Sequence, residues 1–458
     1  MPVQLLVKNG TIVSPTSSLR GHLVVEGGRV AEILFRDGSL PEAETVVDAE
    51  GLHVLPGLID PHVHFRVPGL DYKEDFETGS QAAVCGGIST IIDMPNVKPP
   101  TSDVESLELK LECARGMSYC DFGIYAVLID GSGPHIEPLA EAGVCGYKIF
   151  MGDTIGSIEP PVDGEMIEQW RVMAGTGLRC GVHAEDNGIL FYLRDKLKAE
   201  GRTDPLAFVE SRPAVAEVEA IQRAILFARE AGSKLMIYHM SSKEGVEVLR
   251  RTKAEGQVDV TGETGPHYFL FEAQDMIRKG LGSLIRMNPP VRSADHGEGI
   301  WQGVLDGTID VIGTDHSPHT REEKCYDDRL GDIWKPLSGW PGVETNVPVM
   351  LTLVNEGRLT LNQYVKLQSE RPAQCWNLYP RKGSLDIGAD GDVTIVDMNK
   401  PGVIDEEKLH SKNKLSPWHG WHVTAQPVYT IVRGQIIAKD NELADGAPQT
   451  GQFIKPVT

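Results

Sequence analysis

Short apolar runs alternate with longer amphipathic stretches through the central part of the chain. The apolar runs are short and end at polar residues, so each of them predicts a strand. They are Ser89–Met94, Asp121–Leu128, Gly143–Met151, Arg179–Ala184, Lys234–Met240, Asp259–Glu263 and Ile309–Thr314. Helical spacing between them predicts helices at Leu107–Arg115, Ala216–Ala231 and Gly245–Lys253. Repeated strand–helix units favour an α/β fold with a parallel barrel, which we place at residues 56–376.

Both ends of the chain have a different pattern, in which short strands are separated by tight turns. The predicted strands are Val3–Val7, Leu23–Glu26 and Val30–Phe35 at the start, and Val393–Val396, Val428–Val432 and Ile436–Ala438 at the end. Neither end has enough strands for a stable sheet of its own. We therefore expect residues 1–55 and 377–458 to pair into one small β-sandwich domain.

Charge narrows the class of partner. The 458 residues include 44 Lys and Arg against 65 Asp and Glu, which gives a formal charge of −21. A chain this acidic repels nucleic acid and anionic lipid, so we expect neither as a partner and favour a small molecule. No apolar run reaches the roughly 18 residues of a membrane helix, and the start lacks a basic-then-apolar leader. These features predict a cytoplasmic protein.

The seven cysteines are an odd number, are widely spread and include no Cys-x-x-Cys pair. This spacing argues against a disulfide framework and against a thiolate zinc site. We expect them to be reduced and structural.

Two histidines follow the apolar run Leu55–Ile59. In an extended segment, His62 and His64 project from the same side of the strand, so both imidazoles can reach one metal ion. A single histidine at such a place is more often a packed structural residue. A pair at this spacing is a better candidate for a metal site.

Three further candidate ligands, His183, His239 and Asp315, come directly after other apolar runs. In parallel barrels the chemistry lies where strands end and loops begin. Four imidazoles and one carboxylate on one rim suit Zn²⁺ or a similar divalent ion. We therefore expect a metal centre.

Two ions in a hydrolytic site lie about 3.5–4 Å apart and need an anionic bridge. No Asp or Glu occupies the corresponding end of the run Val144–Met151, which presents Lys148 instead. A protonated lysine repels metal and seeks a carboxylate partner. A neutral amine that reacts with CO2 becomes a carbamate, whose two oxygens can bridge two ions. The missing bridge therefore predicts N6-carboxylysine at Lys148.

Together these residues resemble the metal centre of the amidohydrolase superfamily, in particular its cyclic-amide branch of dihydroorotases, allantoinases, hydantoinases and dihydropyrimidinases. The set is His62, His64, Lys148, His183, His239 and Asp315. The resemblance covers nearly the whole chain. It implies a (β/α)8 TIM barrel, two divalent metal ions such as Zn²⁺, a carboxylated Lys148, and a homodimer or homotetramer.

The resemblance also implies a role for each ligand. His62 and His64 bind the first ion, and His183 and His239 bind the second. The ions lower the pKa of a bridging water toward neutrality and polarise the ring carbonyl. Asp315 binds the first ion, accepts the proton of the water as general base and passes it to the leaving nitrogen. The expected reaction is hydrolysis of a cyclic amide or ureide C–N bond, and the reverse ring closure.

Arg66 is the first candidate for substrate choice. It lies two residues beyond His64 on the same side of the strand, and its guanidinium offers a planar fork for a carboxylate. Pairing with a nearby acid such as Asp75 is the alternative.

The pattern His-x-His-Phe-Arg-x-Pro-Gly, residues 62–69, resembles dihydroorotases most closely. That resemblance places Asn96 and His319 on the substrate carboxylate and Asn288 on the ring. The main prediction is therefore a dihydroorotase, which interconverts dihydroorotate and N-carbamoyl-aspartate.

Other motifs favour a different ring. Ser211-Arg212-Pro213 followed by Glu217 looks more like allantoinases and hydantoinases. However, Asp153 stands where hydantoinases and dihydropyrimidinases carry a catalytic tyrosine, and His319 stands where allantoinases usually show cysteine. An allantoinase-like or hydantoinase-like enzyme remains the alternative.

Two functions of another class also remain open. Relatives of this family exist that keep the fold, lose the metal ligands and serve as scaffolds, but every ligand position is filled here. A mononuclear deaminase on the same barrel needs no modified lysine, so Lys148 argues against it.

Overall fold

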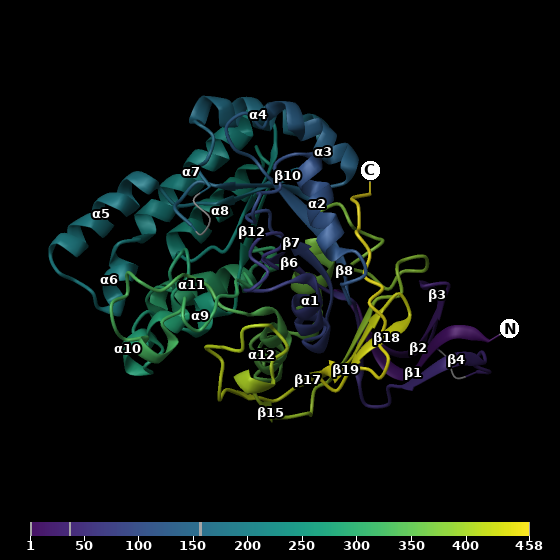
Figure 1. The fold of residues 1–458 in the computed structure, drawn as a ribbon. Coiled ribbons are helices and arrows are strands. Elements are labelled where there is room, and N and C mark those ends of the chain that lie inside the picture. The colour runs from purple at the N-terminus through teal and green to yellow at the C-terminus, as the bar shows by residue number, and fades with distance from the viewer. Residues whose placement is uncertain (1, 36–37, 155–157, 458) are drawn as a thin grey trace.

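The computed structural model describes residues 2–35, 38–154 and 158–457. Eight parallel strands lie in chain order in one sheet and form a nearly closed barrel (Figure 1). They are β6 (Leu58–Val63), β7 (Ile88–Asp93), β8 (Asp121–Val127), β9 (Gly146–Phe150), β10 (Arg179–His183), β11 (Lys234–Ile237), β12 (Val260–Thr264) and β13 (Val311–Ile312). The predicted parallel α/β barrel is confirmed.

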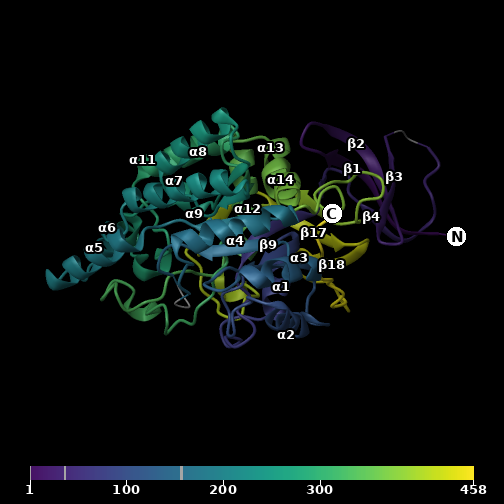
Figure 2. The ribbon, with the colours of Figure 1, turned by 90° about the horizontal axis from the view of Figure 1, so that it is seen from above.

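Helices cover the outside of the barrel, so its strands are buried on both faces and consist of nearly continuous apolar runs. The main helices are α1 (Phe76–Cys85), α2 (Val104–Ala114), α3 (Ile136–Ala142), α4 (Asp163–Thr176), α7 (Ala214–Ala231), α8 (Lys243–Glu255), α11 (Ala294–Leu305) and α12 (Val343–Asn355). Further helices are α5 (Asn187–Ala199), α6 (Pro205–Glu210), α9 (His267–Leu270), α10 (Asp275–Arg278), α13 (Leu361–Val365) and α14 (Arg371–Cys375). Helices α5 and α6 project on the side opposite the N-terminal strands in both views (Figure 2).

The barrel closes where its last strand meets its first. Val63 pairs in parallel with His316. The backbone N–H of His64 donates to the carbonyl of His316 at 2.8 Å, and the N–H of His316 donates to the carbonyl of His62 at 3.3 Å. This seam places the segment after β13 beside the end of β6, although the two are far apart in sequence.

Both ends of the chain contribute to a second, nine-stranded sheet. Its strands are β1 (Val3–Val13), β2 (Ser18–Glu26), β3 (Arg29–Leu34), β4 (Ala43–Asp48), β5 (His53–Pro56), β14 (Val393–Asp397), β17 (Gln426–Val432), β18 (Gln435–Lys439) and β19 (Glu442–Leu443). Strand β14 pairs antiparallel with β5, and this pairing joins the two ends. Alternating side chains such as Leu5 and Val7 form a separate apolar core. A small ladder joins β15 (Gly402–Val403) to β16 (His422–Val423).

A buried cluster of charges connects the barrel to this terminal sheet. The ammonium of Lys382 lies 2.5 Å from Asp121 Oδ2, 2.5 Å from Asp392 Oδ2 and 3.0 Å from Asp390 Oδ2. Asp121 begins β8 of the barrel, whereas Asp392 directly precedes β14 of the sheet. Residues 452–454 also cross to the barrel, where Phe122 exchanges two backbone hydrogen bonds with them.

Several predicted strands are longer than the observed ones; Lys234–Met240, for example, is observed as Lys234–Ile237. Gly143 has φ +104° and ends helix α3, so β9 begins only at Gly146. Of Ile309–Thr314, only Val311 and Ile312 form regular strand, because the chain then bends toward the closure seam. None of the helices in the described ranges is both long enough and apolar enough to cross a membrane.

Candidate active site

One cavity at the carboxyl ends of the barrel strands contains nearly all of the predicted site residues. Its lining includes His62, His64, Arg66, Asn96, Lys148, His183, His239, Asn288 and Asp315. His319 is fully buried and does not line the cavity. The structure thus brings together side chains from six strand ends, as the order of the strands predicts.

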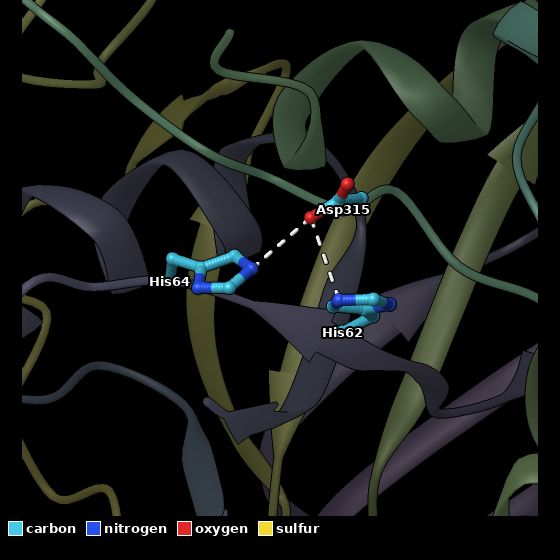
Figure 3. Close-up of side chains that lie close together, drawn as sticks. All are labelled: His62, His64 and Asp315. Atoms are coloured by element: carbon cyan, nitrogen blue, oxygen red, sulfur yellow. Dashed lines mark hydrogen bonds and ion pairs between the residues drawn. The ribbon is translucent and has the colours of Figure 1, made fainter. Parts of the chain in front are cut away.

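The first cluster lies over the closure seam. The Nε2 atoms of His62 and His64 lie 3.4 Å and 3.1 Å from the same oxygen of Asp315, Oδ1 (Figure 3). Their Nδ1 atoms are engaged elsewhere: that of His62 lies 2.8 Å from Glu263 Oε1, and that of His64 lies 2.7 Å from Asn96 Oδ1. Partners on Nδ1 orient both rings and direct Nε2 toward the shared oxygen. These three residues can hold one cation.

The second cluster consists of His183 and His239. Nδ1 of His183 lies 3.0 Å from Nε2 of His239, and Nε2 of His183 lies 2.8 Å from Glu185 Oε2. The two facing nitrogens can share only one hydrogen, whereas both would offer lone pairs to a metal ion between them. Nδ1 of His239 is buried without a hydrogen-bond partner among the described atoms.

Lys148 projects from β9 into the same cavity. Its ammonium nitrogen is buried, has no hydrogen-bond partner among the described residues and lies 3.9 Å from the centre of the Tyr238 ring. Burial lowers the pKa of Lys148 to about 7. Near neutral pH the side chain therefore has a large fraction of neutral amine, the form that reacts with CO2.

The protonation states of the cluster suit cation binding. Burial lowers the pKa of all four histidines, and those of His62 and His239 fall well below the usual range. Burial raises the pKa of the Asp315 carboxyl, but the neighbouring His62 and His64 hold it well below its ordinary value. Neutral imidazoles and an ionised carboxylate are ligand forms of these side chains.

The donor set therefore fits two divalent cations. The buried polar atoms without partners include Lys148 Nζ, His239 Nδ1 and Glu263 Oε2. Buried polar groups are rarely left unpaired, so the orphaned Lys148 Nζ in this cavity indicates a missing partner.

Arg66 is buried, lines the cavity and forms no ion pair among the described residues. Its Nε donates to the carbonyl of Pro318 at 3.3 Å, and burial lowers its pKa to about 10. The alternative partner, Asp75, instead caps helix α1 and pairs with Lys412. The guanidinium is thus available to a ligand.

His319 lies behind Arg66. Its Nε2 is 3.3 Å from Arg66 Nη2 and 3.1 Å from the carbonyl of Ser338, and its Nδ1 is 3.2 Å from Lys73 Nζ. This placement puts His319 outside the cavity lining, and its contact with substrate stays a prediction.

Asn288 and Asn96 both line the cavity. Asn288 donates weakly to the carbonyl of Asp153 at 3.4 Å, and its Oδ1 is buried without a partner among the described residues. The hydrogen bond to Asn96 orients His64, which is a role additional to the predicted contact with substrate. The side chains of Phe150 and Met287 add apolar wall.

Three site residues have a left-handed backbone. Arg66, His239 and Asp315 have φ values of 67°, 37° and 47°. For residues other than glycine such values carry strain that surrounding contacts must offset, and they concentrate at functional sites. Each follows a barrel strand closely, so the strain accompanies the turn that directs the side chain inward.

Sequence reasoning missed the carboxylates that orient the histidines. Glu263 holds His62, Glu185 holds His183, and Asp60 accepts hydrogen bonds from the backbone of His62 and from Thr314. Burial raises the pKa of Asp60 to about 6. The sequence does contain a signal for two of these carboxylates, because Asp60 and Glu263 lie inside short runs of otherwise uncharged residues. A carboxylate buried in such a run needs a hydrogen-bond or charge partner.

Comparison with known proteins gives consistent matches over the whole length. The model of the amidohydrolase family matches residues 53–437. An L-hydantoinase from Paenarthrobacter aurescens is 37% identical, over 96% of this chain and 95% of the relative. An allantoinase from Enterococcus faecalis is 35% identical, over 99% of this chain and all of the relative. The solved structure of an L-hydantoinase (dihydropyrimidinase) from Arthrobacter aurescens superposes with a TM-score of 0.94 at 36% identity, covering 99% of this chain and 100% of that one.

Proposed function

This chain belongs to the amidohydrolase family, and from that premise we propose that it hydrolyses the C–N bond of a five-membered cyclic ureide, a hydantoin or allantoin. The observation that carries the proposal is the convergence of His62, His64, Lys148, His183, His239 and Asp315 on one cavity. That donor set suits the opening of a ring amide by water.

The relatives favour the alternative over the main prediction. They are named hydantoinase and allantoinase, and none of those reported above is named dihydroorotase. The Asp153 and His319 positions had argued against this alternative. Asp153 is exposed, and neither Asp153 nor His319 lines the cavity, so neither position excludes a five-membered ring.

Two divalent cations, for which we propose Zn²⁺, would activate water and polarise the ring carbonyl when bound. His62 and His64 would hold one, His183 and His239 the other, with Lys148 as a carbamate between them. Asp315 accepts the proton of the attacking water and delivers it to the ring nitrogen as that nitrogen leaves. Asn288 Oδ1 accepts a ring N–H, while Phe150 and Met287 pack against the ring.

An assay of three rings tests this function. The purified chain, supplied with Zn²⁺ and bicarbonate, is incubated with a 5-substituted hydantoin, with allantoin and with dihydroorotate, and the ring-opened products are quantified. We expect turnover of a five-membered ring. If neither the hydantoin nor allantoin opens in a sample that holds two metal ions per chain, the proposed function is wrong; opening of dihydroorotate alone would favour the second candidate.

Dihydroorotate remains the second candidate because Arg66 is buried in the cavity without a carboxylate partner among the described residues. Arg66→Ala is expected to lower kcat/KM for a carboxylate-bearing ring selectively. A buried charged pair that loses one partner costs about 2–5 kcal/mol, which corresponds to roughly 30- to 4,000-fold. Equal losses on charged and uncharged rings would rule out Arg66 as the carboxylate site.

A further inference from the structure

Two buried ion pairs lie behind His183 and His239, on the side away from the cavity. They involve the Arg212 and Glu217 of the motif noted in the sequence, whose residues do not line the cavity. Arg212, Glu217 and Arg292 are 6%, 2% and 5% exposed, and Glu185 is fully buried. Charged groups at this depth need complete pairing.

The first pair holds His183. Arg212 Nη2 lies 2.5 Å from Glu185 Oε2, and its Nε lies 3.1 Å from Oε1. The same Oε2 is 2.8 Å from Nε2 of His183. Arg212 Nη2 also donates to the carbonyl of Asp153 at 2.8 Å, which ties the cavity rim to the pair.

The second pair holds the segment that follows His239. Glu217 Oε1 accepts from the backbone N–H of Ser241 at 2.9 Å and of Ser242 at 3.2 Å. Arg292 Nη2 donates to Glu217 Oε2 at 2.9 Å, and its Nε donates to the Ser241 hydroxyl at 3.0 Å. These hydrogen bonds fix the backbone two residues beyond His239, whose own φ is left-handed.

The two pairs are joined, because Arg292 Nη1 donates to the carbonyl of Arg212 at 2.6 Å. One network therefore spans the supports of both histidines. Glu185 follows β10, and Arg212 lies two residues before α7, whose first turn contains Glu217. Arg292 follows Asn288 in the loop before α11.

We propose that Glu185–Arg212 and Glu217–Arg292 act together as positioning residues that set the tautomer of His183 and the spacing between His183 and His239. A carboxylate held by arginine can only accept, so Nε2 of His183 carries the hydrogen and Nδ1 keeps its lone pair toward His239. The motif thus supports the second half of the metal centre and does not select the ring. This inference rests on the metal centre of the proposed function.

The test compares the metal affinity of variants of this network with that of a control variant at a matched buried arginine, Arg179. Arg179 is also 6% exposed and pairs with Asp259, but it begins β10 at the opposite end of the barrel. Arg212→Met, Arg292→Met and Arg179→Met all remove a buried cation. Glu185→Gln is nearly isosteric and serves where an arginine variant fails to fold, because its amide can donate to Nε2 of His183.

Metal-free protein is titrated with Zn²⁺ against a chromophoric chelator, and Co²⁺ absorption reports histidine ligation. In Arg212→Met, Arg292→Met and Glu185→Gln, the affinity of one of the two ions should fall about 10- to 100-fold. Arg179→Met should keep both affinities within about twofold, whatever its loss in Tm. Arg212→Lys should recover part of the affinity, since it retains a cation beside Glu185.

Wild-type affinity for both ions in Arg212→Met and Glu185→Gln would overturn the inference. An equal loss in Arg179→Met would overturn it too, since the effect would then be general loosening of the fold. A wild-type chain that binds two ions but opens none of the three rings would contradict the proposed function alone, and the affinity comparison would still decide the role of the network.

Discussion

At the scale of single residues, Lys148 shows how burial prepares a side chain for chemistry. Its nitrogen lies over the Tyr238 ring, away from water and without a hydrogen-bond partner among the described residues. Desolvation penalises the charged form, so the pKa drops from 10.5 to about 7. An exposed lysine would be almost wholly protonated at neutral pH and would not react with CO2.

A pH dependence follows from this shift. The neutral amine predominates above the folded-state pKa, so carbamate formation at a fixed CO2 pressure should rise as pH increases through about 7. The carbamate carbon can be followed by NMR with 13C-labelled CO2, with Lys148→Ala as the control that should lack the signal. A signal that is constant between about pH 6 and pH 8 would contradict this explanation.

The sequence identified the histidines, the lysine and the aspartate that the structure brings together in the cavity, because each directly follows an apolar run or lies at the end of one. His62, His183 and Asp315 illustrate this, since strand order alone brings their segments to one rim. Glu185 and Arg212 were not assigned as a unit, because their role depends on a pairing across 27 residues that no spacing rule reveals. His319 was placed on the substrate by motif alone, whereas the fold puts it behind Arg66.

At the scale of elements, strand β10 shows how one small residue shapes the site. A Cβ on Gly181 would lie 1.9 Å from Cε2 of Tyr238. The absence of a side chain at Gly181 therefore lets the Tyr238 ring pack inside the barrel, directly beneath Lys148.

Gly181→Ala should consequently destabilise the fold. Overpacking in a dense core costs about 1–3 kcal/mol, which urea unfolding would measure. Gly175→Ala in helix α4 is the matched control, because its Cβ would meet nothing within 4 Å. A helical glycine replaced by alanine is expected to gain about 0.5–1 kcal/mol. Equal free energies of unfolding in the two variants would refute the packing argument.

The ends of several helices are set by capping residues, which the hydrophobic pattern of the sequence does not reveal. Helices α2 and α8 begin earlier than predicted, because Asp103 and Ser242 accept hydrogen bonds from backbone N–H groups of the first turn. The strand predicted from Gly143 starts three residues late, because Gly143 ends a short helix that the apolar pattern did not reveal. The order of the barrel strands was predictable, because each strand is largely buried and rich in apolar residues.

At the scale of the whole molecule, Lys382 connects the two units. It is surrounded by Asp121, Asp390 and Asp392 and is almost fully buried. Lys382→Met would leave these carboxylates without their shared cation, and breaking a buried pair costs about 3–5 kcal/mol. We expect this loss in the free energy of unfolding measured with urea.

The control for Lys382→Met is Lys400→Met. Lys400 pairs with the exposed Asp440 at 2.7 Å, and such surface pairs contribute about 0–1 kcal/mol. If the two variants lose similar stability, the buried cluster around Lys382 does not hold the barrel and the terminal sheet together.

The pairing of β5 with β14 has a consequence for biosynthesis. Strand β5 leaves the ribosome early, but the partner that completes its hydrogen bonds is made only after more than three hundred further residues. At about 5–20 residues per second, this interval lasts on the order of tens of seconds. During it, the nascent N-terminal strands present an unfinished edge that other chains can bind. We therefore expect chaperones to bind this segment during translation, until β14 is made and covers the edge.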